Sequence, residues 1–331
     1  MKINTIKQTI VLAAVLAGAS HTALGLVTQG ASSAYGISAN TQIIDLNTLL
    51  GIGVSLAVPP TPLVSGVAPA PYSLSNSLAS FSATSGSSTV LGGGTLGLSS
   101  GVLTVTASST VDGGAGSRNA QGSSTVANFS STTSLTGRTS LLNSANLFGF
   151  TGSTVSSFAS VTGDYGAFTT SGGSRIVDAS GAGDGFTTFT VFGVNFNVAV
   201  NALGEVAPNT TLTINSSSSA SFSDSLGTDL TGSLSIILNE QILSGDGITS
   251  RGLEVNALHV TYNNAGASFF NALGIKVDDA NRVNGGFIVG HSQASLQALQ
   301  AVPEPSTCAL FGIGGCLAFL RFRALSKRNA V

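Results

Sequence analysis

The sequence is poor in charge, cysteine and histidine, and it has no tryptophan. Of its 331 residues, 12 are Lys or Arg and 14 are Asp or Glu, so charged residues make up 8% of the chain. An ordinary soluble domain has roughly 25%. The body of the chain has no cluster of basic residues to neutralise phosphates, which argues against nucleic-acid binding. Two cysteines and three histidines argue against a disulfide scaffold and a cysteine-based zinc module.

Hydrophobic residues are frequent, at 42% of the chain, and 42 glycines accompany them. Disordered chains are usually highly charged and poor in Val, Ile and Phe, so this composition predicts a folded protein. Six of the twelve basic residues lie in two short terminal segments: Lys2, Lys7, Arg321, Arg323, Lys327 and Arg328. Residues 26 to about 305 keep six basic and all fourteen acidic residues, which gives this part of the chain a formal charge of about −8.

The first 25 residues have the three parts of a secretory signal peptide. Lys2 and Lys7 form a basic start, residues 10–19 are an apolar run, and Ala23-Leu24-Gly25 has the small residues that a signal peptidase requires. We expect cleavage near Gly25, after passage through the Sec translocon. A buried N-terminal helix is the alternative.

A second apolar segment lies near the other end of the chain. Residues 307–320 carry no charge, and the basic tail 321–331 follows them directly. Fourteen helical residues span about 21 Å, short of a bilayer core of about 30 Å, so we expect a weak transmembrane helix. The positive-inside rule places the tail in the cytoplasm and the body outside. A terminal core helix is the alternative, although such a helix would carry a polar stripe.

The residues just before this segment carry a family resemblance. Val302, Pro303, Glu304 and Pro305 precede the apolar run and the basic tail, and residues 302–331 together resemble the PEP-CTERM sorting signal. The resemblance implies that an exosortase, a membrane-embedded cysteine transpeptidase, removes the tail in a Gram-negative bacterium that makes exopolysaccharide. Two prolines keep such a peptide extended and unable to pair in a sheet, so its backbone is accessible to a processing enzyme.

The body, residues 26–300, shows the period of two that is typical of β-strands. Apolar and polar residues alternate at 192–200, and the pattern recurs at 103–107, 211–215 and 234–238. Between Leu253 and Tyr262 the apolar phase switches at Ala257-Leu258, which predicts a bulge or a strand buried on both faces. We expect an all-β body, an antiparallel β-sandwich, with a β-solenoid as the alternative.

Turns and irregular segments are expected between these strands. Residues 58–72 hold five of the eight prolines and should form an extended edge or a connecting loop. Residues 76–100 and 108–140 are rich in Ser, Gly and Thr and predict loops, weak strands or disorder. Five clusters predict turns: Asp112-Gly113-Gly114, Gly172-Gly173, Gly183-Asp184-Gly185, Gly245-Asp246-Gly247 and Asn284-Gly285-Gly286.

Several short motifs of the body are similar to the choice-of-anchor P family. They are Ala34-Tyr35-Gly36-Ile37-Ser38, the proline-rich stretch 60–72, Leu238-Asn239-Glu240-Gln241, Val255-Asn256-Ala257-Leu258-His259-Val260 and Ile288-Val289-Gly290-His291-Ser292. The resemblance extends over most of residues 30–295. It implies an exported, β-rich bacterial protein whose relatives end in different sorting tails. It implies no particular chemistry.

The body offers few candidates for catalysis. His259 and His291 are its histidines, and no Gly-x-Ser-x-Gly turn marks a nucleophilic serine. A glycosidase needs two carboxylates about 5–10 Å apart, for which Glu205, Glu240 and Glu254 are candidates. Glu240 and Glu254 would meet only if their strands are neighbours, and tryptophan, which often stacks on sugars, is absent.

The sequence therefore predicts no catalytic, cofactor-binding or metal-binding residues. We expect a non-enzymatic surface or extracellular-matrix protein with a structural or adhesive role in an exopolysaccharide-rich envelope or biofilm. Its surface must consist largely of Ser, Thr, Asn and Gly, which offer many hydrogen-bonding partners and little charge repulsion. The alternative is an exported protein that binds or cleaves polysaccharide, with Glu240, Glu254 and His259 as the residues to inspect.

Overall fold

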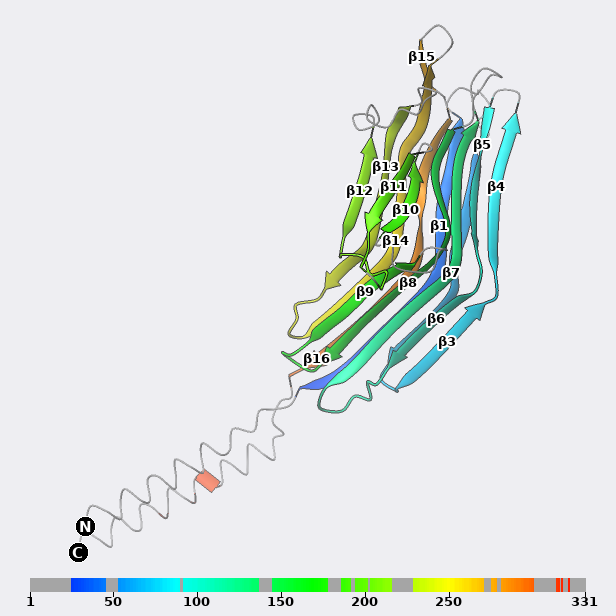
Figure 1. Cartoon of the computed structure of the whole chain (residues 1–331). Helices are drawn as coiled ribbons and strands as arrows, with labels where there is room; N and C mark the ends of the chain where they lie inside the picture. Colours follow the sequence, from blue (N-terminus) through cyan, green and yellow to red (C-terminus); the bar gives the residue numbers. More distant parts are fainter. Residues whose placement is uncertain are drawn as a thin grey trace, which may run out of the picture.

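The structure is a computed structural model. It describes residues 25–45, 53–89, 92–136, 145–177, 186–191, 194–201, 203–215, 229–270, 275–278 and 281–300, together with positions 314, 315, 317 and 321. The body in these ranges is all-β and forms two antiparallel sheets (Figure 1). The antiparallel prediction is confirmed, and the stacked repeats of a solenoid are not present in the described body.

The seven-stranded sheet has the order β12-β13-β14-β16-β1-β2, and β15 pairs with β14. Its strands are β1 (Leu26–Asp45), β2 (Val54–Ala68), β12 (Thr210–Asn215), β13 (Asp229–Ser244), β14 (Ser250–Phe270), β15 (Lys276–Asp278) and β16 (Asn281–Leu299). The first and last long strands are direct neighbours, because β1 pairs with β16 along most of its length.

The nine-stranded sheet has the order β11-β10-β8-β7-β5-β4. Two further pairs complete it: β9 with β8, and β3 with β6, which pairs in turn with β7. Its strands are β3 (Tyr72–Leu78), β4 (Phe81–Thr89), β5 (Gly92–Ser100), β6 (Leu103–Ser109), β7 (Arg118–Thr136), β8 (Ala145–Gly163), β9 (Thr169–Val177), β10 (Phe186–Val191) and β11 (Val194–Ala199).

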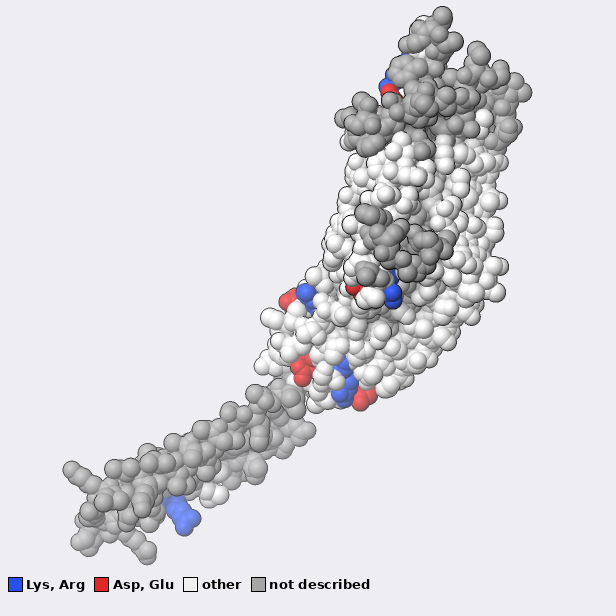
Figure 2. Space-filling model, viewed as in Figure 1, with Lys and Arg blue, Asp and Glu red and all other residues white. Residues whose placement is uncertain are grey.

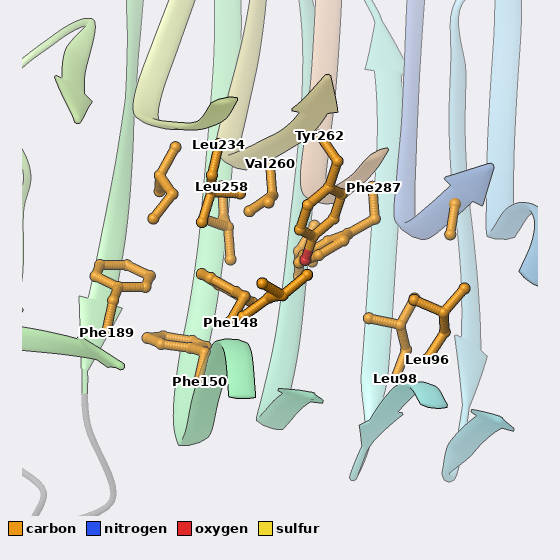
Figure 3. Packing of buried hydrophobic residues seen from close by; sticks show 14 of the residues in the cluster. Leu96, Leu98, Phe148, Phe150, Phe189, Leu234, Leu258, Val260, Tyr262 and Phe287 are labelled. Carbon is orange, nitrogen blue, oxygen red and sulfur yellow. The ribbon is translucent and has the colours of Figure 1, made fainter. Parts of the chain in front are cut away.

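The hydrophobic core lies between the two sheets and differs between its two halves. In one half, aromatic rings from β7, β8 and β10 meet apolar side chains of β13, β14 and β16 (Figure 3). Phe148 of β8 lies 5.8 Å from Phe287 of β16, ring centre to ring centre, and Phe150 stacks on Phe189 at 4.7 Å. The other half is built mainly from Ala and Val, such as Ala120, Ala159 and Ala294, which are fully buried.

Small side chains let the two sheets approach closely in that second half. A Cβ atom at Gly122 of β7 would lie 2.5 Å from the carbonyl oxygen of Ser33 and 2.8 Å from that of Gln293, both in the opposite sheet. Similarly, a Cβ at Gly172 of β9 would lie 2.5 Å from Leu253 Cδ2. Stacked sheets normally stand about 10 Å apart because side chains fill the gap. Where the two sheets approach more closely, as they do at Gly122 and Gly172, only glycine fits between them.

Along the long strands, the alternation of inward-facing and outward-facing residues shifts by one position where the two halves of the core meet. In β14, Leu253 and Val255 face the core at odd positions, whereas Leu258 and Val260 do so at even positions, as the sequence predicted. Residues with positive φ lie at the same level of the neighbouring strands: Asn239 (51°) in β13 and Gly290 (67°) in β16. The same switch occurs in the other sheet, near Asn128 and Gly152, and the long strands bend about half-way along the body (Figure 1).

Other strand predictions have mixed outcomes. The alternating run at 192–200 contains β11, which pairs with the preceding strand β10 in a hairpin. The runs at 103–107, 211–215 and 234–238 lie in β6, β12 and β13. The proline-rich stretch forms the edge strand β2 and the connection to β3. In their described parts the Ser- and Gly-rich segments form strands, chiefly β4, β5 and β7, because alternate residues face the core, such as Leu96 and Leu98 in β5 and Ala120 and Gly122 in β7.

Two of the predicted turns are correct and two are wrong. Asp112-Gly113-Gly114 connects β6 to β7, and Gly245-Asp246-Gly247 connects β13 to β14. Gly172-Gly173 lies within β9, and Asn284-Gly285-Gly286 lies within β16. These glycines serve close packing rather than chain reversal, since a Cβ at Gly285 or Gly286 would clash with backbone oxygens of adjacent strands. Gly183-Asp184-Gly185 lies outside the described residues.

The predicted terminal segments lie largely outside the described residues, including Val302, Pro303, Glu304 and Pro305. Strand β1 begins at Leu26, directly after the expected cleavage position at Gly25. Positions 314, 315, 317 and 321 are helical and exposed. In the part of the chain that the structure describes, no helix is long and apolar enough to cross a membrane.

The close approach of the sheets leads to a first prediction. Gly122→Ala should lower the free energy of unfolding by about 1–3 kcal/mol, because the added methyl group meets backbone rather than a movable side chain. The matched control is Gly97→Ala in β5, where a Cβ would meet nothing closer than 3.8 Å and should be neutral or stabilising. Urea unfolding midpoints measure both, and equal midpoints would contradict the packing argument.

Candidate functional site

The polar residues highlighted by the sequence meet on the outer face of the seven-stranded sheet, at the level where the strands bend. Leu253 and Val255 of β14 face the core, so Glu254 and Asn256 face away from it. Strand pairing then aligns one residue from each of four neighbouring strands in a row: Glu240 of β13, Asn256 of β14, His291 of β16 and Tyr35 of β1. Glu254 and His259 flank this row on β14.

Asn256 is the centre of the hydrogen-bond network. Its Nδ2 donates to Glu240 Oε2 at 2.8 Å and to Glu254 Oε1 at 3.3 Å. Its Oδ1 lies 2.7 Å from His291 Nδ1. An amide oxygen only accepts hydrogen bonds, so Nδ1 of His291 carries the proton in this contact. One buried amide therefore links both carboxylates to the buried histidine.

The two histidines have different surroundings. His259 Nδ1 lies 2.9 Å from Glu240 Oε2, and its Nε2 lies 3.3 Å from the hydroxyl of Thr261. The side chain of His259 is 29% exposed. His291 is buried under the ring of Tyr35, which stacks on it with ring centres 4.3 Å apart and an interplanar angle of 12°.

Burial dominates the proton affinity of the covered groups. It lowers the pKa of His291 to about 4, even though Glu254 Oε1 lies 3.7 Å from its Nδ1. Burial also raises the pKa of Tyr35, and the carboxylates of Glu254 and Glu240 add to this effect. At neutral pH the stacked pair is therefore uncharged, while its carboxylate neighbours are satisfied by the amide of Asn256 and by His259.

A shallow groove adjoins the network. It has a volume of about 520 Å³ and is lined by residues of β1, β2, β14 and β16, including Ser38, Asn40, Pro60, His259 and Thr261. Gly285 and Gly286 also line it, so no side chain of theirs fills the space. Of the network, His259 reaches the groove, whereas Glu240 and Glu254 do not line it.

This arrangement bears directly on the glycosidase alternative. The structure brings Glu240 and Glu254 together, as that alternative requires, and both contact one nitrogen of Asn256. Glu205, the third candidate, lies elsewhere, near β9, where it accepts a hydrogen bond from Asn201 and forms a β-bridge with Arg175. The carboxylates that meet are engaged with neighbouring strands instead of opening into the groove.

Sequence reasoning missed the bridging role of Asn256 and the stacking of Tyr35 on His291. Alternation along 253–262 places Glu254 and Asn256 on one face, and the turn at 245–247 implies a hairpin that brings Glu240 opposite them. These two sequence features are sufficient to place Glu240, Glu254 and Asn256 on one face of the hairpin formed by β13 and β14. The position of Tyr35 required the pairing of β1 with β16, which joins the two ends of the body.

Among the described residues, no group of three or more His, Cys, Asp or Glu side chains has an arrangement that would hold a metal ion. Asn284, near the predicted turn in β16, exchanges hydrogen bonds with Asn264 of β14. Its polar atoms thus serve interstrand bonding.

Comparison with known proteins adds little. No family model matches the chain, and no curated protein matches it. Among solved structures, the chain is similar to the translocator domain of autotransporter NalP from Neisseria meningitidis at 10% sequence identity, over 90% of this chain and 96% of that chain, with a TM-score of 0.13. A similarity at that TM-score carries no argument about fold or function.

The burial of His291 predicts a pH dependence of stability. Its pKa of about 4 in the folded state is below the value of about 6.5 in an unfolded chain, so the unfolded state binds more protons between these values. Stability should fall as the pH drops from about 6.5 to 4, by up to about 3 kcal/mol from this group. Thermal unfolding across this range measures the slope.

His291→Gln should remove most of that slope, because glutamine does not titrate there. His259→Gln is the matched control on the same sheet face and should retain the slope, because it leaves the burial of His291 under Tyr35 unchanged. An unchanged pH dependence in His291→Gln would refute the assignment to His291.

Proposed function

We propose that the chain is an exported, exosortase-processed protein of the cell surface or extracellular matrix, with a structural or adhesive role in an exopolysaccharide-rich envelope. The sorting-signal resemblance at 302–331 and the similarity of the body to the choice-of-anchor P family motivate this proposal. In it, residues 1–25 guide export through the Sec translocon, and the C-terminal helix holds the protein in the inner membrane until the exosortase releases it to the exterior of a Gram-negative bacterium.

The pairing of β1 with β16 is the observation that carries the proposal. Leu26 pairs with Leu299, so the chain enters and leaves the body at the same end (Figure 1). A signal peptide before Leu26 and a sorting tail after Leu299 would then approach the membrane from one end of the body. The rest of the body would point away from the membrane, as a surface protein requires.

The surface of the body also supports a non-catalytic role. In the view of Figure 2, the described charged side chains gather in the half of the body nearest its termini and at the far tip, and a long uncharged surface lies between them. Exposed positions of β3, β4, β7 and β12 are largely Ser and Thr. Such a surface hydrogen-bonds to hydroxyl-rich polymers or to itself with little electrostatic repulsion.

The sorting proposal predicts a processing defect. Replacing Pro303, Glu304 and Pro305 by Ala should leave the full-length protein in the inner membrane, because the extended substrate peptide is lost. Fractionation of the native host and mass determination of the mature C-terminus measure this. A variant that still reaches the exterior without its tail would disprove the exosortase reading.

A second candidate function, an exported polysaccharide-binding or polysaccharide-cleaving protein, is favoured by the juxtaposition of Glu240 and Glu254 beside a groove. Pull-down of the full chain on host exopolysaccharide, followed by an assay for reducing ends, separates binding from cleavage. On the structural proposal we expect retention without new reducing ends, and Glu240→Gln should not change the result. Reducing ends that appear with the parent protein and vanish with Glu240→Gln would favour the enzyme.

A further inference from the structure

The four outer edges of the two sheets are protected to very different degrees. A free strand edge presents unpaired N–H and C=O groups and can pair with another chain, so proteins usually block it with proline, charge or covering segments. Strand β2, one edge of the seven-stranded sheet, contains Pro59, Pro60 and Pro62 and cannot present a continuous row of donors. The opposite edge strand, β12, has six residues.

One side of the nine-stranded sheet is also protected. Two strands form this side, beyond β8 in the strand order. One of them, the edge strand β11, has six residues. The other edge strand on this side, β9, is covered by the segment that contains Gly204 and Val206. The N–H of Ile176 donates to Gly204 O at 2.8 Å, and the N–H of Val206 donates to Ser174 O at 3.3 Å. Arg175 adds a charge on this edge.

The other side of this sheet is formed by β3 and β4, and it has none of these protections among the described residues. Strand β4 has nine residues, pairs with β5 on one side, and has no described strand on its other side. Residues 72–111, which include both edge strands, contain no proline and no charged residue. Figure 1 shows β3 and β4 following one another along this outer border.

The core is also incompletely covered at this edge. Phe81 and Ala83 of β4 pack against the main hydrophobic cluster but remain only partly buried, unlike Leu96 and Leu98 of the adjacent strand β5, which are 2% and 3% exposed. A further strand beside β4, with small or apolar residues facing inward, would cover Phe81 and Ala83. Strand β4 itself has such residues at alternate positions.

We infer that β4 is a self-association edge, at which a second copy of this chain adds its own β4 in antiparallel orientation. Full overlap of the nine residues places the two-fold axis at Ser85, the middle of β4, and joins the two nine-stranded sheets into one. The edge is self-complementary, because it brings no charges together and places hydroxyl-bearing and small residues opposite one another. A groove of about 480 Å³ adjoins β4, and the residues of β4, β5 and β7 that line it are Ser, Thr, Gly and Leu. It offers a foreign peptide no charged anchor, so main-chain pairing with its own copy is the favoured use.

This inference does not depend on the proposed export or sorting. It concerns the folded body, and it is tested on the purified full chain in a non-ionic detergent that keeps the terminal segments soluble. A failure of the sorting experiment would leave it standing, and its own failure would leave the sorting proposal standing.

The first test is cysteine cross-linking. With Cys308 and Cys316 replaced by Ser, Ser85→Cys should form a disulfide-linked dimer under mild oxidation, since directly opposed residues of paired strands lie within disulfide distance. The control is Ser65→Cys on the exposed face of the proline-rich edge β2, which should remain monomeric. Equal cross-linking of the two variants, or none with Ser85→Cys, would overturn the inference.

The second test disrupts the edge without changing the backbone. Thr84→Lys places two like charges across the two-fold axis and should weaken dimerisation at least tenfold in sedimentation velocity experiments. Thr211→Lys is the matched control, an exposed threonine on the edge strand β12, and should leave dimerisation unchanged. Circular dichroism verifies that both variants fold. A parent chain that stays monomeric at high concentration, or a Thr84→Lys variant that dimerises like the parent, would disprove the role of β4.

Discussion

The close approach of the two sheets in the half of the body nearest the chain ends is the constraint on which the rest of the structure depends. Gly122 of β7 lies against the backbone of Ser33 and Gln293, so there is no room for a side chain at this position. The core of this half is built mainly from Ala and Val, together with Leu253 and Leu296. The other half holds the phenylalanines, and the strands must bend between the two spacings.

The bend has consequences for the outer surface. Where the inward-facing positions switch, residues such as Asn239 and Gly290 adopt positive φ, and the pleat changes phase in neighbouring strands together. The polar row from Glu240 to Tyr35 lies at this level. Its hydrogen bonds connect β13, β14 and β16, and the stacking of Tyr35 on His291 adds β1, at the place where the sheet changes direction. The network is therefore a structural feature as well as the candidate site.

The low content of charged residues determines the chemical character of the surface. With few charges, the body relies on hydroxyl and amide groups for solubility and for contact with other molecules. The scarcity of charged residues also leaves the edge formed by β3 and β4 without the lysines that usually discourage strand pairing. A protein with such a surface is suited to assembly with itself or with hydroxyl-rich polymers, and less suited to attracting a charged ligand from a distance.

The sequence by itself determined the fold class, several strands and the phase switch at Ala257-Leu258, because alternation of apolar residues is a local property. It also indicated Glu240, Glu254 and His259 as residues to inspect. It did not determine that Gly172 and Gly285 belong to strands, since the side chain of Leu253 that approaches Gly172 and the backbone of Asn40 that approaches Gly285 come from distant parts of the chain. Only the tertiary structure decided that β1 joins β16, that Tyr35 stacks on His291 and that β4 is an outermost strand among those the structure describes, because these outcomes depend on pairings between strands far apart in sequence.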